Sequence, residues 1–189
     1  MSTMRLLHIC LILLFSTEIS SQHCDLLSFQ QKKLNKDSLE LLEKMGGNFP
    51  FQCFNEGIDF KSMQDVLKRQ SSQKENVKLA IQNILQEIFT VFSKNLTQTA
   101  WDTISIITFQ NKLHQQIERL EACLGFQKEK DGTKMGSDGL VLTKLKVRRY
   151  FQGIYNFLEE KQYSLCAWEI IRMEMTRCFL FVDQLTKSL

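Results

Sequence analysis

The chain has 189 residues, enough for one compact domain and too few for two domains of ordinary size. It carries 24 basic and 21 acidic side chains, so the net charge is a mild +3. Charges of both signs are mixed along the whole chain, without the dense positive field that binds nucleic acid. Length and charge therefore indicate a single domain and exclude a nucleic-acid-binding protein.

Residues 1–23 are predicted to be a secretory signal peptide. Arg5 supplies a positive charge, residues 6–15 are uncharged and almost wholly apolar, and small polar residues follow. We expect cleavage between Ser21 and Cys24, leaving residues 24–189 as one secreted domain. A run of ten residues is too short to cross a bilayer, and no other apolar segment is long enough to do so, so we expect no membrane insertion.

Five cysteines remain after the expected cleavage: Cys24, Cys53, Cys123, Cys166 and Cys178. Their spacing is wide and irregular, without a Cys-x-x-Cys pair, which in an oxidising compartment indicates disulfides rather than a metal cluster. An odd number leaves at least one thiol free or paired between molecules. Spacing alone allows fifteen arrangements of two bridges.

The first half of the mature chain predicts two helices. The first covers about 26–45, with Leu34 and Leu42 among its apolar positions. The second opens with Ser72 and Glu75, which fit a capping box. Its apolar residues then recur at helical spacing: Val77, Ile81, Ile84, Leu85, Ile88 and Phe92.

Three further helices are expected, over about 99–123, 139–159 and 163–186. Their predicted inward residues are Trp101, Ile104, Leu113, Ile117 and Leu120, then Leu145, Tyr150, Ile154, Phe157 and Leu158, then Trp168, Ile171, Met175, Cys178 and Val182. The last set forms one stripe, so we interpret Cys178 as a buried, unreactive thiol.

Two connections are predicted to be long, at about 46–71 and 124–138. No stretch shows the sustained alternation of a strand, so the predicted fold is all-α. A helical bundle with two long crossover connections is typical of helical cytokines and growth hormones. We therefore expect a five-helix bundle in which helices run up-up-down-down.

A catalytic set is missing from the sequence. After the expected cleavage His114 is the one certain histidine, and it lies in a predicted helix where a solvated histidine is the simplest interpretation. Phosphate-binding, dinucleotide-binding and metal-binding motifs are also missing, so we expect no enzyme, cofactor or metal. Asn95 begins the sequence Asn-Leu-Thr, and we interpret it as a glycosylation site between two helices.

The stretch YFQGIYNFLEEKQYSLCAW, residues 150–168, resembles the signature stretch of the type I interferons. The similarity extends over nearly the whole mature chain. CDL at 24–26 resembles the start of mature α-type members, ILQEIFTVF at 84–92 their second helix, and LHQQIERLEACL at 113–124 their third.

The resemblance implies a cytokine that binds both chains of the type I interferon receptor as a monomer. Binding would trigger JAK–STAT signalling and an antiviral response. The resemblance also implies one cysteine pairing, Cys24 with Cys123 and Cys53 with Cys166. Cys178 is then the free thiol.

The same resemblance places the surface for the high-affinity receptor chain at Phe51, Phe54, Arg172, Met173, Thr176 and Arg177. Arginine side chains around a methionine suit such an interface, although a solvated helix face is the simpler interpretation. Truncating either arginine is expected to cost the fold less than about 1 kcal/mol. Gly57 stands where α-type members carry an arginine that dominates binding.

For the low-affinity receptor chain, the resemblance implies a surface that includes Phe89, Thr90, His114 and Arg148. Gln110 and His114 replace tyrosines of the family, and Phe89 fits the core equally well.

Two other classes of protein share part of the sequence pattern. One is a helical hormone with a reproductive or growth-regulatory role, and the other is a secreted lipid-carrying bundle, which should show wider apolar faces.

Overall fold

The computed structural model describes residues 24–56, 59–67, 74–131 and 137–189, and the expected signal peptide lies outside them. The regular structure of the described residues is helical, without a strand. The elements are α2 (Leu27–Gly46), the 3₁₀-helix η1 (Phe51–Glu56), α3 (Met63–Leu67), α4 (Lys74–Phe92), α5 (Thr103–Asp131), α6 (Ser137–Glu160) and α7 (Leu165–Thr186). The expected all-α fold is confirmed.

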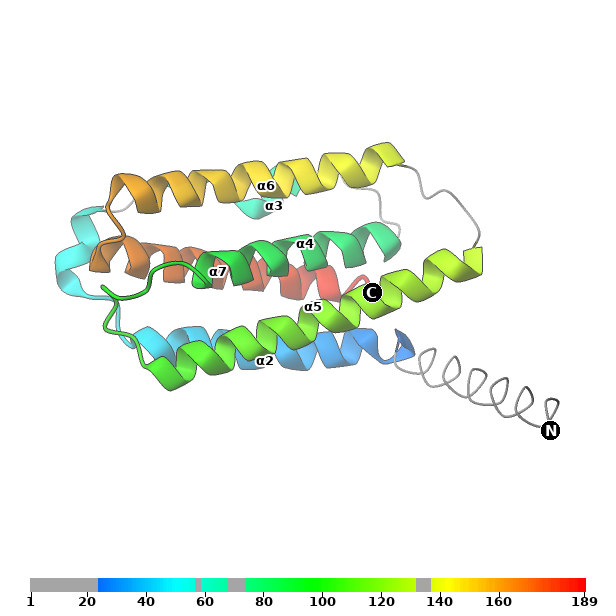
Figure 1. The fold of residues 1–189 in the computed structure, drawn as a ribbon, viewed down its shortest axis with the longest axis horizontal. Coiled ribbons are helices and arrows are strands. Elements are labelled where there is room, and N and C mark those ends of the chain that lie inside the picture. Colours follow the sequence, from blue (N-terminus) through cyan, green and yellow to red (C-terminus); the bar gives the residue numbers. More distant parts are fainter. Residues whose placement is uncertain (1–23, 57–58, 68–73, 132–136) are drawn as a thin grey trace, which may run out of the picture.

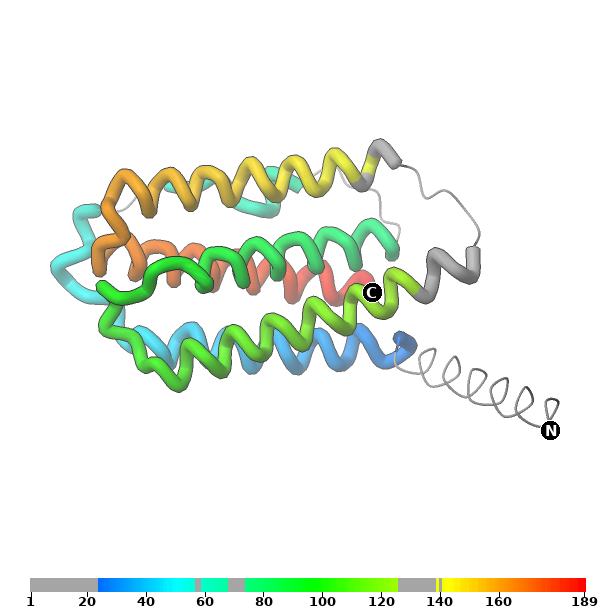
Figure 2. Tube along the Cα trace, in the orientation of Figure 1, coloured from blue at the N-terminus to red at the C-terminus, as the bar shows by residue number. Residues whose placement is uncertain are grey.

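The long helices form a bundle whose axes are nearly aligned (Figure 1). Following the chain colours in Figure 2, α2 and α4 run in one direction, whereas α5 and α7 run in the other. These four helices therefore have the predicted up-up-down-down arrangement. The remaining long helix, α6, packs against α4 and α7. The short helix η1 covers the end of the bundle where α7 begins (Figure 1).

The start of the third long helix differs from the prediction. Asp102 accepts hydrogen bonds from the backbone N–H and the hydroxyl of Ser105, at 2.8 and 2.6 Å, so the helix begins at Thr103 rather than near residue 99. These bonds hold the pKa of the Asp102 carboxyl below its usual value. Trp101 is buried, as expected, but it precedes the helix.

Much of the expected loop at 124–138 is helical, because α5 continues to Asp131 and α6 begins at Ser137. Two predicted inward residues are also wrong. Ile104 is 75% exposed and Leu145 is 56% exposed, since each lies on the outer side of its helix. Ser72 of the expected capping box lies outside the described residues.

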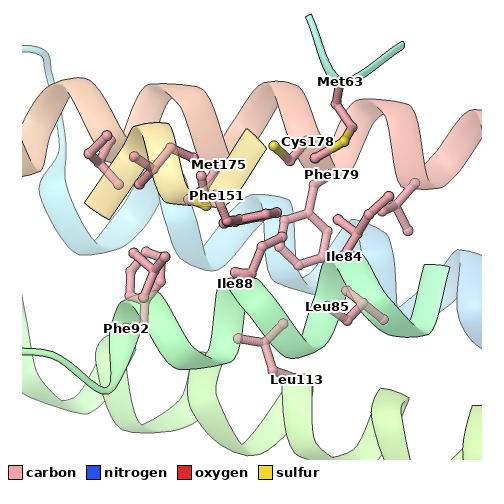
Figure 3. Close-up of a cluster of buried hydrophobic side chains, with 14 of the residues drawn as sticks. Met63, Ile84, Leu85, Ile88, Phe92, Leu113, Phe151, Met175, Cys178 and Phe179 are labelled. Carbon is pink, nitrogen blue, oxygen red and sulfur yellow. The ribbon is translucent and has the colours of Figure 1, made fainter. Parts of the chain in front are cut away.

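The core is built from the predicted apolar stripes together with a group of large aromatic side chains (Figure 3). Phe92 contacts Phe109 with ring centroids 4.7 Å apart, and Phe109 contacts Phe179 at 5.8 Å, so α4, α5 and α7 share one aromatic layer. Cys178 is fully buried in this core, which agrees with its predicted inward position.

A buried polar layer also crosses the bundle. The Gln31 amide donates to Asn35 at 2.9 Å and to Gln116 at 2.6 Å, and Asn35 donates to the Thr186 hydroxyl at 3.1 Å. Gln116 in turn donates to the Ser38 hydroxyl at 3.0 Å. These satisfied groups fix the relative positions of α2, α5 and α7, and the apolar pattern gave no sign of them.

Candidate functional site

The start of α7 is tied covalently to the long connection that follows α2. The Ser164 hydroxyl caps the helix by accepting from the backbone N–H of Ala167 at 3.3 Å. Cys166, in the first turn, forms a disulfide with Cys53 of η1, and Cys24 forms one with Cys123. The structure thus contains the pairing implied by the resemblance, which places η1 against the first turns of α7.

Arg172 forms a second tie inside the protein, between α7 and the end of α2. Its guanidinium donates to the Glu169 carboxylate at 2.8 and 3.0 Å, to the carbonyl of Leu42 at 3.0 Å and to the carbonyl of Gly47 at 3.1 Å. The indole of Trp101 donates to the other oxygen of Glu169 at 2.6 Å. We call these residues the arginine clamp: Trp101, Glu169 and Arg172 with the carbonyls of Leu42 and Gly47.

The clamp corrects one predicted site residue. Arg172 was expected on an exposed face, but its side chain is 3% exposed and that of Glu169 is 4% exposed. Arg172 lies one helical turn after Trp168, only about 40° further around the helix, so it borders the buried stripe. The expectation that its truncation would cost the fold little is therefore wrong, and Arg172 is part of the scaffold.

Gly46 makes room for the clamp at the end of α2. A Cβ atom on this residue would lie 2.3 Å from Nε and 2.7 Å from Cζ of Arg172, well inside contact distance. The next residue, Gly47, has φ +62°, a backbone conformation that favours glycine, and its carbonyl accepts from Arg172. The pair Gly46-Gly47 thus allows α2 to end directly against the guanidinium.

Four of the predicted residues, two on η1 and two on α7, are exposed and combine apolar with basic side chains. Phe51 is 89% exposed and Phe54 is 64% exposed, and their ring centroids lie 5.7 Å apart. Met173 is 46% exposed, while the side chain of Arg177 is 63% exposed, one turn further along α7. We call Phe51, Phe54, Met173 and Arg177 the α7–η1 surface.

Thr176, the remaining predicted residue of this region, is less exposed than these four. Thr176 is half-buried, and its hydroxyl donates to the backbone carbonyl of Arg172 at 3.2 Å. Gly57 lies outside the described residues. The α7–η1 surface is therefore narrower than the predicted set.

The Arg177 guanidinium is hydrogen-bonded to a buried polar cluster on its inner side. Arg177 donates to Glu174 at 2.9 Å, and the Glu174 side chain is only 5% exposed. The Tyr150 hydroxyl donates to the other oxygen of Glu174 and lies 3.4 Å from the Cys178 sulfur. Burial raises the pKa of Tyr150 and raises that of the Cys178 thiol to about 12, so both groups stay protonated at neutral pH.

The four residues predicted for the low-affinity chain lie on three neighbouring helices. Phe89 is half-buried, and its ring centroid is 6.3 Å from that of the exposed His114, which pairs with Glu118 at 3.1 Å. Thr90 and Arg148 line one groove between α4 and α6. Phe89 thus belongs partly to the core and partly to the surface.

Two broader tests concern metals and membranes. Among the described residues no group of three histidine, cysteine, aspartate or glutamate side chains is placed to hold a metal ion. In that same part of the chain, none of the helices has the length and apolarity needed to cross a membrane.

The arginine clamp is the main feature that sequence reasoning missed. Its signal was present in the spacing, because Glu169 and Arg172 are three residues apart and directly follow the buried Trp168 and Ile171. Two charges beside such a stripe can neutralise one another inside the core. The carbonyl partners at the end of α2 and just after it lie over 120 residues earlier, so no local pattern could reveal them.

An all-helical bundle with long crossovers, two disulfides and a surface of aromatic and basic residues defines a helical cytokine. The family model described as the interferon alpha/beta domain matches residues 27–189. Interferon epsilon of Homo sapiens is 38% identical over 179 residues, covering 95% of this chain and 85% of that protein. Interferon beta of Tachyglossus aculeatus aculeatus is 34% identical over 189 residues, covering 100% and 99%.

Among solved structures, zebrafish interferon 2 superposes with a TM-score of 0.69 at 25% identity, covering 81% of this chain and 97% of that one. The chain therefore belongs to the interferon alpha/beta family, the type I interferons, whose members are cytokines and not enzymes.

Proposed function

We propose that this chain is a secreted cytokine that binds both chains of the type I interferon receptor, triggers JAK–STAT signalling and induces an antiviral state. Family membership supports the receptor class. The observation that carries the proposal is the α7–η1 surface, where large apolar side chains remain exposed although the elements beneath are held by the Cys53–Cys166 disulfide and by the hydrogen bonds of Arg172 to the end of α2.

The α7–η1 surface is the proposed contact for the high-affinity chain. Rigid aromatic anchors beside an arginine are the composition of interface hot spots, and preorganisation by the clamp reduces the ordering cost of binding. Phe51, Phe54, Met173 and Arg177 are the proposed direct contacts, with Thr176 at the edge. Arg172 would act only by holding the end of α2 against α7.

The low-affinity chain is proposed to bind the opposite group of helices, through Phe89, Thr90, His114 and Arg148. His114 and Arg148 are exposed, and Thr90 borders the groove between α4 and α6. Simultaneous contact with two surfaces on one monomer would bring the two receptor chains together.

Residues 1–23 are proposed to direct secretion of a mature domain that begins near Cys24, and Asn95 is proposed to carry a glycan. Asn95 is exposed in the turn between α4 and α5, where its side-chain oxygen accepts from the backbone N–H and hydroxyl of Thr97. Glycosidase treatment of secreted protein should lower its mass and leave signalling nearly unchanged. Terminal sequencing of the same material should place cleavage between residues 21 and 24.

Reporter cells test the proposed function directly. Purified protein is added to cells with an interferon-responsive reporter, and to matched cells that lack one receptor chain or the other. We expect a response only when both chains are present. A response that persists without either chain would assign the protein to another receptor and overturn the proposal.

A further inference from the structure

The middle of α6 is a local exception to the otherwise mixed charges of the chain, and it carries a basic segment that the proposed function uses only in part. Residues 144–149, KLKVRR, place four cations within six positions, and no acidic residue occurs between residues 139 and 158. Lys144, Arg148 and Arg149 are exposed. Among the described residues, none of the four cations forms an ion pair with a carboxylate. Their charge is therefore available to an external anion.

Two of these cations border a groove of about 670 Å³ between α4 and α6. Lys144 and Arg148 lie on one wall, and the lining also contains Gln82, Gln86 and Asn83 of α4. The Nδ2 atom of Asn83 is buried and finds no hydrogen-bond acceptor among the residues that the structure describes. A buried amide donor without a partner indicates a position that a ligand oxygen can satisfy.

Two carboxylates also line the groove, and both already accept hydrogen bonds from the protein. Glu87 accepts from the Tyr155 hydroxyl at 3.0 Å, and Glu121 accepts from the Gln82 amide at 2.9 Å. Neither forms an ion pair with Lys144 or Arg148. The basic wall therefore keeps its charge despite these neighbours.

The cations are arranged along a line rather than around a point. The Lys94 ammonium lies 5.4 Å from the ring centre of Tyr155, and Tyr155 is hydrogen-bonded to the groove residue Glu87. Lys144 and Tyr155 are eleven residues apart on α6, which corresponds to about 16 Å along the helix. Arg148 lies between them. Such a line matches an extended polyanion better than a single phosphate or carboxylate.

We propose that the α4–α6 groove and the basic face of α6 bind a sulfated polysaccharide of the heparan sulfate class. Lysine and arginine would pair with sulfates, while the amides and the Thr90 hydroxyl of the groove would bond sugar hydroxyls. This ligand goes beyond the proposed receptor function. Because Thr90 and Arg148 belong to both surfaces, the polysaccharide and the low-affinity receptor chain would compete.

The test uses a heparin octasaccharide and the secreted chain, with binding measured by calorimetry at about 0.15 M salt, where distant surface charges are screened. Lys144→Ala/Arg148→Ala is compared with the control Lys32→Ala/Lys33→Ala, which removes the same charge from the exposed face of α2. We expect at least tenfold weaker binding for the α6 pair and under twofold for the control. Asn83→Leu should weaken binding severalfold, and desulfated heparin should not bind.

Three results would overturn this proposal. Equal weakening by the two pairs would show diffuse attraction to net charge. Equal affinity for duplex DNA, or for phosphatidylserine vesicles, at the same salt would show a surface without selectivity for a sulfated sugar. Unchanged affinity of the α6 pair, with its circular dichroism intact, would place the ligand elsewhere. The reporter response to wild-type protein is scored separately, so failure of heparin binding leaves the receptor proposal standing.

Discussion

Two arginines of α7 lie five residues apart and have opposite environments. Arg172 is enclosed by Glu169 and by two backbone carbonyls at the end of α2. Arg177 is largely exposed, and within the described part of the chain Glu174 is its one hydrogen-bond partner. The same residue type therefore supports the fold in one case and offers a charged surface in the other. What separates them is the segment packed against each side of the helix.

The largest expected loss of stability follows from substituting the buried arginine, Arg172. Arg172→Met removes the positive partner and leaves the Glu169 carboxylate buried without compensation, so the free energy of unfolding should fall by about 3–5 kcal/mol. Urea denaturation followed by circular dichroism measures this loss. Adding Glu169→Gln to the same chain removes the stranded charge, keeps an acceptor for Trp101, and should restore at least half of it. A single variant as stable as wild type would show that the clamp contributes nothing.

Gly46→Ala should act on the same clamp through sterics. The added methyl group would collide with the Arg172 guanidinium and displace it from the carbonyls of α2, costing about 1–3 kcal/mol. Gly153→Ala is the matched control, because it lies in a helix with no atom within 4 Å of its Cβ position. The control should gain up to about 1 kcal/mol from helix propensity. Thermal melts of both variants give the comparison, and equal shifts would contradict it.

A smaller effect is expected in the cluster behind Arg177. Tyr150→Phe removes the hydroxyl that donates to the buried Glu174, which should cost about 1–2 kcal/mol. Tyr155→Phe loses a comparable bond to Glu87 at a half-buried position and should cost under about 1 kcal/mol. Chemical denaturation of the pair decides the order. If Tyr155→Phe is the more damaging, burial does not set the strength of these bonds.

The last prediction concerns the pairing and the reactivity of the cysteines, where no change in stability is expected. Non-reduced peptide mapping of secreted protein should recover Cys24–Cys123 and Cys53–Cys166. Burial raises the pKa of the Cys178 thiol to about 12, so the reactive thiolate is scarce at pH 8. Iodoacetamide should therefore label Cys178 only after unfolding. Rapid labelling of folded protein would show that this thiol is accessible.

Local periodicity was enough to predict the helices and most of the core, because α4 and α7 bury one regular stripe each. It failed at a helix end set by one capping residue, and at a side chain whose partners lie far away in the sequence. Asp102 caps α5 so that the helix begins later than predicted, and Ile104 in its first turn faces solvent. Arg172 looked like surface because its acceptors belong to α2 and the loop after it. The exposure of Met173 and Arg177, in contrast, followed from the helical pattern alone.

The central claim is that the α7–η1 surface binds the high-affinity receptor chain. The most direct measurement is the dissociation constant of that isolated chain for Met173→Asp, with Leu142→Asp on α6 as a control of similar exposure. A charge placed in a desolvated hot spot should cost about 2 kcal/mol or more, roughly thirtyfold in affinity, while the melting temperature stays within a few degrees. Leu142→Asp should bind as wild type does. Normal binding by Met173→Asp would contradict the assignment of this surface.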